Sequence, residues 1–444
     1  MAVEVLEGPK AASNINPGAR PPHQETPLKT LKMFQRTLLA TAAVVTLAAH
    51  AGEVEVLHYW TSGGEAKSAA ALKATLQGKG HTWKDFAVAG GGGDNAMTVL
   101  KSRVVSGNAP AAAQIKGPAL QEWAGEGVLA NIDDVAKAEK WDTLLPPVVA
   151  NVMKYKGNYI AAPVNVHRVN WLWASNAAFK KAGAKVPTNW DEFFVAAEAL
   201  KKAGIISVAH GGQNWQDFTT FESVALGVGG ADFYKKALVQ LDQASLTGAT
   251  MTKVLDTFKK VKGYTDKNAP GRDWNLATAM VIKGEAGMQL MGDWAKGEFV
   301  AAGKKPGADF SCVAAPGTAK SFTFNVDSFA MFKLKNDANT KAQKDLASTI
   351  MSTEFQEVFN LNKGSIPVRL NMNLAKFDDC AKLSSNDFVS TAKSGGLVPS
   401  VAHGMAIGSA TSGAIQDAVS QFWNDDKMST KDAQAKIASA AKVK

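Results

Sequence analysis

EVEVLHYWTSGGE, residues 53–65, is the most informative stretch of the sequence. Polar and apolar side chains alternate over residues 53–58, which is the pattern of a β-strand with one buried face. The glycine and polar residues at 59–64 predict a loop, and the Ala-rich residues 66–76 predict a helix. This strand–loop–helix order predicts the first unit of an α/β fold.

The same order of elements recurs along the chain. Residues 81–88 predict a second strand, and residues 94–105 predict a helix capped by Asp94. Another helix is predicted over 192–203, with Thr188 or Asn189 as its cap. Further strands are predicted at 112–115, 286–292 and 328–332, and further helices at 119–126, 252–264, 275–283, 340–351, 354–362, 414–423 and 431–441. We therefore expect an α/β fold built on mainly parallel sheets.

The N-terminal part of the chain predicts a leader rather than a folded element. Residues 33–51 combine positive charge, an apolar run of about 13 residues and small residues before Ala51, as a secretory signal peptide does. The run is too short for a bilayer core of about 30 Å; a membrane anchor or a buried first helix is the alternative. Residues 1–32 are polar and read as an extension or a mis-assigned start. We expect export, with cleavage near Ala51.

The composition suits a large soluble chain with no nucleic-acid function. The 444 residues are 46% hydrophobic and 20% charged, which excludes a disordered chain. The formal charge of +9 comes from Lys residues that are scattered and interleaved with Asp and Glu, such as Lys201-Lys202 and Lys259-Lys260. Nucleic-acid-binding proteins normally cluster such residues in a stripe.

The chain has two cysteines, Cys312 and Cys380. Two thiols in an exported protein usually form a disulfide, and two unpaired buried thiols are the alternative. The seven His residues are scattered, and no metal-ligand spacing is present, so we expect no metal site.

Several predicted loops that follow strands place an aromatic ring beside a charged or amide side chain. In open α/β sheets, ligands bind beyond the carboxyl ends of the strands. Aromatic faces suit the C–H face of a sugar ring, and carboxylate, Lys, amide and His groups suit its hydroxyls. The candidates are Tyr59, Trp60, Ser62, Glu65, Gln114, Lys116, His167, Trp215, Gln216, Asp217, Asp293, Trp294, Lys363 and His403. This combination favours a neutral polyol as ligand.

Each candidate also has an ordinary structural explanation. Ser62 and Glu65 match a capping box, and Trp60 suits a hydrophobic core. Lys363 suits a helix C-terminus, and His167 and His403 suit structural roles. The glycines at 90–93 lack the Gly-Lys-Ser/Thr of a phosphate loop and predict a flexible turn. No GxSxG motif is present, although a glycosidase needs only two carboxylates and is not excluded.

Five segments resemble a known family. They are EVEVLHYWTSGGE at 53–65, DNAMTVLKSRVVSGNAPAAAQ at 94–114, PTNWDEFF at 187–194, AMVIKGEAGMQLMGDWAKGEF at 279–299 and KGSIPVR at 363–369. Together they resemble the extracellular solute-binding proteins of carbohydrate ABC transporters, in the maltose-binding-like family 1. Within that family the chain is most similar to periplasmic glucose/mannose-binding proteins.

The resemblance implies two α/β lobes that are joined by a hinge and close on a ligand. It implies an N-terminal lobe of 52–164 plus 318–365 and a C-terminal lobe of 165–317 plus 366–444, with both cysteines in the latter. The implied ligand-binding residues are Trp60, Glu65, Gln114, Lys116, His167, Trp294, Asp327, Lys363 and His403. Tyr59, Trp215 and Asp293 are implied more weakly. For Tyr59 the reason is that relatives often have two adjacent Trp where this chain has Tyr59 and Trp60.

The expected function is that of a periplasmic binding protein without enzymatic activity or cofactor. We expect it to be a monomer that binds a monosaccharide, glucose first and mannose or galactose next, and passes it to the permease of an inner-membrane ABC importer. The alternatives are an exported carbohydrate-active enzyme, a binding protein for a disaccharide or other polyol, and a structural or interaction protein that uses its basic surface.

Overall fold

The computed structural model describes residues 51–443. The expected extension at 1–32 lies outside these residues, and so does the expected signal peptide at 33–51 apart from Ala51. Among the described helices, none is long and apolar enough to cross a membrane.

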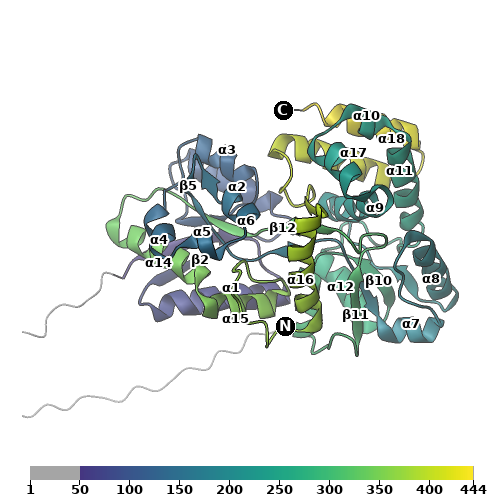
Figure 1. Ribbon diagram of the computed structural model, residues 1–444, viewed down its shortest axis with the longest axis horizontal. Helices are drawn as coiled ribbons and strands as arrows, with labels where there is room; N and C mark the ends of the chain where they lie inside the picture. The colour runs from purple at the N-terminus through teal and green to yellow at the C-terminus, as the bar shows by residue number, and fades with distance from the viewer. Residues whose placement is uncertain (1–50, 444) are drawn as a thin grey trace, which may run out of the picture. The chain divides into compact units, whose positions relative to one another are not determined.

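A five-stranded sheet with the order β2-β1-β3-β13-β6 forms the centre of the first lobe. Its strands are β1 (Glu53–His58), β2 (Thr82–Ala87), β3 (Ala112–Gln114), β6 (Ala161–Pro163) and β13 (Ser328–Met331). The helices around it are α1 (Gly63–Gly78), α2 (Asp94–Val105), α3 (Ala119–Gly125), α4 (Asp133–Ala138), α5 (Trp141–Leu144), α6 (Pro147–Val152), α14 (Asp337–Met351) and α15 (Thr353–Lys363), with a hairpin of β4 (Lys154–Tyr155) and β5 (Asn158–Tyr159). Figure 1 shows these elements on the left.

The second lobe contains a four-stranded sheet with the order β11-β8-β10-β9. Its strands are β8 (Trp171–Ser175), β9 (Ile206–Val208), β10 (Ala286–Leu290) and β11 (Phe310–Ala314). The helices of this lobe are α7 (Asn176–Ala182), α8 (Trp190–Lys202), α9 (Asn214–Tyr234), the π-helix η1 (Lys235–Val239), α10 (Gln243–Thr247), α11 (Ala249–Lys262), α12 (Trp274–Lys283), α13 (Trp294–Ala301), α17 (Ser409–Asn424) and α18 (Thr430–Ala440).

A small third sheet and one helix lie between these two groups of elements (Figure 1). The sheet has the order β14-β12-β7, from β7 (His167–Arg168), β12 (Phe322–Asn325) and β14 (Leu397–Pro399), and the helix is α16 (Asp379–Ser394). The chain crosses between lobes from β6 to β7 and from β12 to β13, and a backbone bridge joins Val166 to Ile366. The expected two-lobe α/β fold is therefore confirmed.

The sheets are mixed, not mainly parallel as the sequence predicted. β1 pairs in parallel with β2 and β3, but β13 runs antiparallel to both β3 and β6. In the second lobe, β8 is antiparallel to β10 and β11. The crossing strands enter and leave each lobe in opposite directions, which introduces antiparallel pairs that a strand–helix alternation does not reveal.

Buried and more exposed side chains alternate at the start of β1, as the sequence predicted. Val54 and Val56 are fully buried in the core of the first lobe. Glu55 points away from that core, where its carboxylate binds Arg103 at 2.6 Å and Lys84 at 3.2 Å. The parallel neighbours on both sides hold the end of β1, and with it the loop of Tyr59 and Trp60, at the edge of the sheet where ligands bind in this class of fold.

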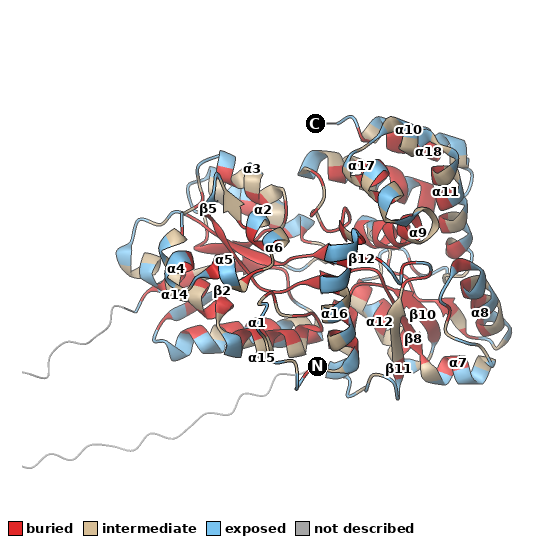
Figure 2. Cartoon of the chain, in the orientation of Figure 1, coloured by how far each residue is buried: buried red, intermediate tan, exposed pale blue. Residues whose placement is uncertain are grey.

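Helix α9 is the buried centre of the second lobe. All residues of 215–226 are buried, as Figure 2 shows by the red colour of this helix, and Phe218 and Phe221 belong to the lobe's hydrophobic core. A helix that is apolar or satisfied all round is buried in this way. The sequence pattern predicted a loop at Trp215, Gln216 and Asp217. In the structure these residues lie in the first turn of α9. Glu222, on the same helix, is a buried carboxylate.

Glu222 should make the stability of the protein depend on pH. Burial raises the pKa of Glu222 to about 7, from an ordinary value of 4.5. The folded state therefore binds this proton more tightly, and the resulting stabilisation is complete below about pH 4.5 and lost as the pH rises to about 7. The shift corresponds to about 3 kcal/mol. We expect the free energy of unfolding of the wild type, relative to that of Glu222→Gln, to fall by about 3 kcal/mol across this range in urea titrations; a constant difference would contradict the assignment.

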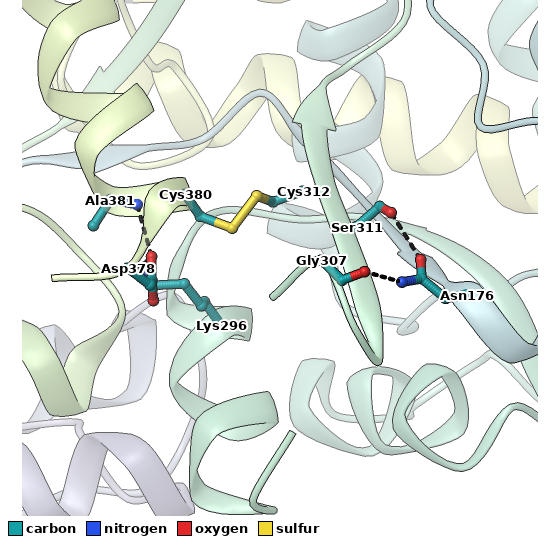
Figure 3. The surroundings of a disulfide bond; sticks show 8 residues. All are labelled: Asn176, Lys296, Gly307, Ser311, Cys312, Asp378, Cys380 and Ala381. Carbon is teal, nitrogen blue, oxygen red and sulfur yellow. Dashed lines mark hydrogen bonds and ion pairs between the residues drawn. A yellow bond between two sulfur atoms is a disulfide. The ribbon is translucent and has the colours of Figure 1, made fainter. Parts of the chain in front are cut away.

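Cys312 and Cys380 form a disulfide between β11 and α16, as expected (Figure 3). Next to it, Asp378 accepts hydrogen bonds from Lys296 at 3.0 Å and from the backbone N–H of Ala381 at 2.8 Å. Arg168 of β7 binds Asp387, near the middle of α16, at 2.6 Å. The disulfide and two ion pairs thus attach α16 to β11, α13 and β7.

Candidate functional site

A small cavity of about 40 Å³ lies where both lobes present the ends of their strands. It is lined by Tyr59, Trp60, Glu65, Gly91, Gly92, Lys116, His167, Trp215, Trp274, Trp294, Asn325, Asp327, Lys363 and His403. A larger groove of about 830 Å³ shares Tyr59, Gly92, Lys116, Trp215 and His403 with this cavity and continues between α2, α3 and α17. The structure thus brings ten of the twelve sequence-predicted ligand-binding residues to one cavity.

An ion pair between Glu65 and Lys363 connects two distant segments at the cavity. Lys363 Nζ lies 2.6 Å from Glu65 Oε1, and only 3% of the Lys363 side chain is exposed. The ammonium group lies 5.9 Å from the ring centre of Trp60 and 6.0 Å from that of Trp294. One indole comes from each lobe, so this cation lies near an aromatic ring of both lobes.

The capping-box explanation of Glu65 is wrong. The Ser62 side chain makes no capping hydrogen bond to α1, and its hydroxyl instead donates to Glu65 Oε2 at 3.0 Å. The backbone N–H of Gly64 in the first turn of α1 donates to Glu298 of α13 at 2.8 Å. A carboxylate from the second lobe therefore satisfies this helix end, and Glu65 is left to face the cavity.

His167 is held between two carboxylates. Its Nδ1 contacts Asp293 Oδ1, and its Nε2 lies 2.9 Å from Asp327 Oδ2. Burial alone lowers the pKa of His167, but the charges of Asp293 and Asp327 outweigh burial and raise that pKa above its ordinary value. Burial opposes ionisation of Asp327 as well, yet His167, Lys363 and Lys116 hold the pKa of Asp327 well below its usual range. The imidazolium of His167 and the carboxylate of Asp327 are therefore favoured in their charged forms.

Two predicted ligand-binding residues do not line the cavity but lie behind it. Asp293 accepts from the His167 ring and from the backbone N–H of Arg168 at 2.9 Å. Gln114 accepts from the backbone N–H of Tyr59 and donates to Asp327 Oδ1, both at 3.3 Å. These side chains orient the residues that face the cavity, while Gln114 also reaches the outer groove.

Three side chains that line the cavity have buried polar atoms without a hydrogen-bond partner. Within residues 51–443, both ring nitrogens of His403, the hydroxyl of Tyr59 and Oδ1 of Asn325 are buried and have no hydrogen-bond partner. Burial lowers the pKa of His403 well below its ordinary value, with help from Lys116 and His167, which keeps the ring neutral. Leaving such groups unpaired in a buried site costs free energy, so a polar partner placed in the cavity would stabilise them.

Sequence reasoning missed Gly91, Gly92, Trp274 and Asn325 as lining residues. Asp273-Trp274 begins a helix just as Asp293-Trp294 does, which is a signal that could have identified Trp274. The glycine loop predicted as a flexible turn packs on aromatic rings instead. A Cβ at Gly92, whose φ is +82°, would lie 2.8 Å from the indole of Trp215, so only glycine fits there.

The formal charges around the cavity balance. Glu65, Asp293 and Asp327 carry negative charge, and Lys116, Lys363 and the protonated His167 carry positive charge. Burial lowers the pKa of Lys116, and Asp327 opposes that effect. Within the described part of the chain, no cluster of three or more His, Cys, Asp or Glu side chains is arranged to hold a metal ion.

Comparison with known proteins identifies the family. A sequence profile of bacterial extracellular solute-binding proteins matches residues 60–357. The chain belongs to this family. This solute-binding protein is 48% identical over 406 residues to a probable sugar-binding periplasmic protein of Brucella suis. The alignment covers 91% of this chain and 96% of the relative. It is 49% identical over 396 residues to a protein with the same name from Rhizobium meliloti, which covers 89% and 95%.

Solved structures share the fold of this solute-binding protein at low identity. A chitin oligosaccharide binding protein aligns with a TM-score of 0.74 at 18% identity, covering 88% of this chain and 98% of the other. A bacterial solute receptor with an exclusive preference for β-D-galactopyranose aligns with a TM-score of 0.72 at 19% identity, covering 88% and 98%. The family is one of transport-related binding proteins, so the alternative of a carbohydrate-active enzyme is wrong.

Proposed function

We propose that this solute-binding protein captures a neutral hexose, glucose first and mannose or galactose next, in the periplasm and delivers it to the permease of an ABC importer. The observation that carries the proposal is the cavity itself. It has indole rings from both lobes and charged side chains of both signs, whose formal charges balance once Asp293 behind His167 is included. The relatives from Brucella suis and Rhizobium meliloti are both named probable sugar-binding periplasmic proteins, which supports the sugar and the compartment.

The cavity residues divide into two roles in this proposal. Trp60 and Trp294 provide the flat apolar faces against which a pyranose ring stacks. Glu65 and Asp327 accept hydrogen bonds from hydroxyls, and Lys363 donates to them. The remaining proposed ligand-binding residues are Tyr59, Lys116, His167, Trp215, Asn325 and His403, with Gln114 and Asp293 supporting them from behind. Since the site is buried, a misplaced hydroxyl leaves one of these groups unpaired, and epimers are thereby distinguished.

The mechanism is binding followed by closure of the two lobes. The Glu65–Lys363 pair and the His167–Asp327 contact both join segments that meet at the cavity. A ligand that touches residues from both lobes stabilises the closed arrangement, because it shifts the equilibrium by its differential affinity for the two states. The closed monomer with its sugar is then the form that the permease distinguishes from the empty protein.

A disaccharide is the second candidate ligand. The outer groove of about 830 Å³ opens directly from the cavity through Tyr59, Lys116 and His403. A second sugar ring attached to the first has room there. The solved structures with this fold include receptors for both oligosaccharides and a monosaccharide, so the fold does not choose between the two.

Calorimetric titration with glucose, mannose, galactose, maltose and glucuronate tests the proposal. We expect a hexose to bind most tightly and glucuronate to bind at least tenfold more weakly than glucose, because its carboxylate upsets the charge balance in a buried site. Maltose as the tightest ligand would favour the second candidate. Heat from none of the neutral sugars, with a folded protein confirmed by circular dichroism, would overturn the proposal.

A further inference from the structure

The turn at residues 400–405 presents His403 to the cavity. Within the turn, Met405 N–H donates to the carbonyl of Ser400 at 2.8 Å, and Gly404 N–H donates to that of Val401 at 3.0 Å. The backbone N–H of His403 donates to the Ser400 hydroxyl oxygen at 3.2 Å. The ring of His403 packs on Trp294 and Trp215, with ring centres 4.7 and 5.6 Å apart. The orientation of the imidazole therefore depends on how this turn is anchored.

Glu222 of α9 anchors the turn through hydrogen bonds. Its Oε1 accepts from the Ser400 hydroxyl at 2.6 Å, and its Oε2 accepts from the backbone N–H groups of Val401 at 2.9 Å and Ala402 at 3.3 Å. Tyr234 Oη lies 2.8 Å from the same Oε2 and 2.9 Å from the carbonyl oxygen of Pro399. One carboxylate thus gathers three donors from three consecutive residues of the turn.

Three of the four hydrogen bonds of this carboxylate lead to the turn. Glu222 is 0% exposed and does not line the cavity. Its contacts reach the turn and Tyr234. An ionisable group buried in a helical core costs free energy unless its hydrogen bonds compensate. Such a group at the base of a ligand-contacting turn points to the turn as the reason for its presence.

We propose that Glu222 is a positioning residue that fixes His403 for sugar binding through the Ser400 hydroxyl. The chain of contacts runs from Glu222 Oε1 to the Ser400 hydroxyl, and from that hydroxyl to the backbone N–H of His403. The inference rests on the proposed sugar-binding function and adds a residue that never touches the ligand. Because residues 215–226 of α9 are all buried, the turn is tied to a rigid base.

The test compares Glu222→Gln and Ser400→Ala with the wild type. In Glu222→Gln, an amide N–H₂ group replaces one of the two acceptor oxygens. Either the Ser400 hydroxyl or the two backbone N–H groups of the turn then lose their acceptor. Ser400→Ala removes the relay to His403 and leaves the buried carboxylate in place. We expect each variant to bind glucose on the order of tenfold more weakly than the wild type. Ser207→Ala is the matched control, because Ser207 is a buried hydroxyl of the same lobe that donates to Ala197 and contacts neither turn nor cavity.

A spectroscopic readout separates positioning from a general loss of stability. In histidine-labelled, unliganded protein, we expect the imidazole resonance of His403, assigned with a His403→Gln variant, to shift in Glu222→Gln and Ser400→Ala and to stay in place in Ser207→Ala. The resonance of His167 should not move in any of the three. Wild-type affinity in both turn variants, or weaker binding with an unchanged His403 resonance, would overturn the inference. If the wild type itself binds no hexose, the proposed function fails instead, and the resonance shift still reports whether Glu222 positions His403.

Discussion

Replacing Glu65 by alanine should reduce hexose affinity at least a hundredfold. The substitution removes an acceptor that faces the cavity and leaves Lys363, 3% exposed, without its partner at 2.6 Å. Truncating one member of a buried charge pair typically costs 2–5 kcal/mol or more, much of it because the remaining charge is unpaired. Isothermal calorimetry measures the loss, and far-ultraviolet circular dichroism checks that the fold persists.

Glu357→Ala is the control for this experiment. Glu357 also pairs with a lysine, Lys376, but 70% of that lysine side chain is exposed, and the pair lies away from the cavity. Exposed pairs of this kind contribute little, so we expect unchanged affinity. A Glu65→Ala protein that binds hexose as tightly as Glu357→Ala does would remove Glu65 from the site.

Removing the disulfide with Cys312→Ser and Cys380→Ser should lower the free energy of unfolding by about 4 kcal/mol. The bridge closes a loop with a sequence separation of 68 residues, and a loop of that size restricts the unfolded chain by about this amount in the chain-entropy model. Sugar affinity should change little, because Lys296–Asp378 and Arg168–Asp387 still hold α16. Denaturant titration measures the stability, and calorimetry measures the affinity.

Reduction of the wild type provides the matched control for the double variant. Wild-type protein unfolded in the presence of a reductant should show the same stability as the double variant, and the reductant should not affect the variant. If the variant and the oxidised wild type unfold at the same denaturant concentration, the disulfide does not stabilise the fold.

Local signals in the sequence were sufficient for much of the fold. The alternation at 53–58 became β1, and Asn189 caps α8 by accepting from the N–H of Glu192 at 2.9 Å. Both features depend on residues close in sequence, where side-chain periodicity and capping chemistry operate. The prediction that Asp94 caps its helix was wrong. Gly93, with a φ of +101°, is the cap, and Asp94 is the first residue of the helix.

Tertiary contacts explain what the sequence did not reveal. Residues 215–217 resemble a loop by composition, yet they begin α9, because the lobe buries that helix on all sides. Asp217 accepts from His210 at 2.8 Å and Ser420 at 2.6 Å, so it satisfies the core and does not face the cavity. Local patterns do not encode such partners.

The same reason limits the prediction of the candidate site. Family resemblance identified residues that face the cavity, such as Trp60 and Lys363, but gave Asp293 and Gln114 the same role. Their supporting positions depend on contacts with His167 and Tyr59, which are distant in the sequence. Asn325 was missed because its unpaired oxygen becomes evident only when the two crossing strands are placed side by side.

A crystal structure of the protein grown with glucose tests the proposed function most directly. We expect one pyranose ring in the cavity, stacked on Trp60 and Trp294, with its hydroxyls within hydrogen-bond distance of Glu65, Asp327 and Lys363. A glucose molecule bound only in the outer groove, or a closed cavity without sugar at a glucose concentration that saturates the calorimetric titration, would contradict it.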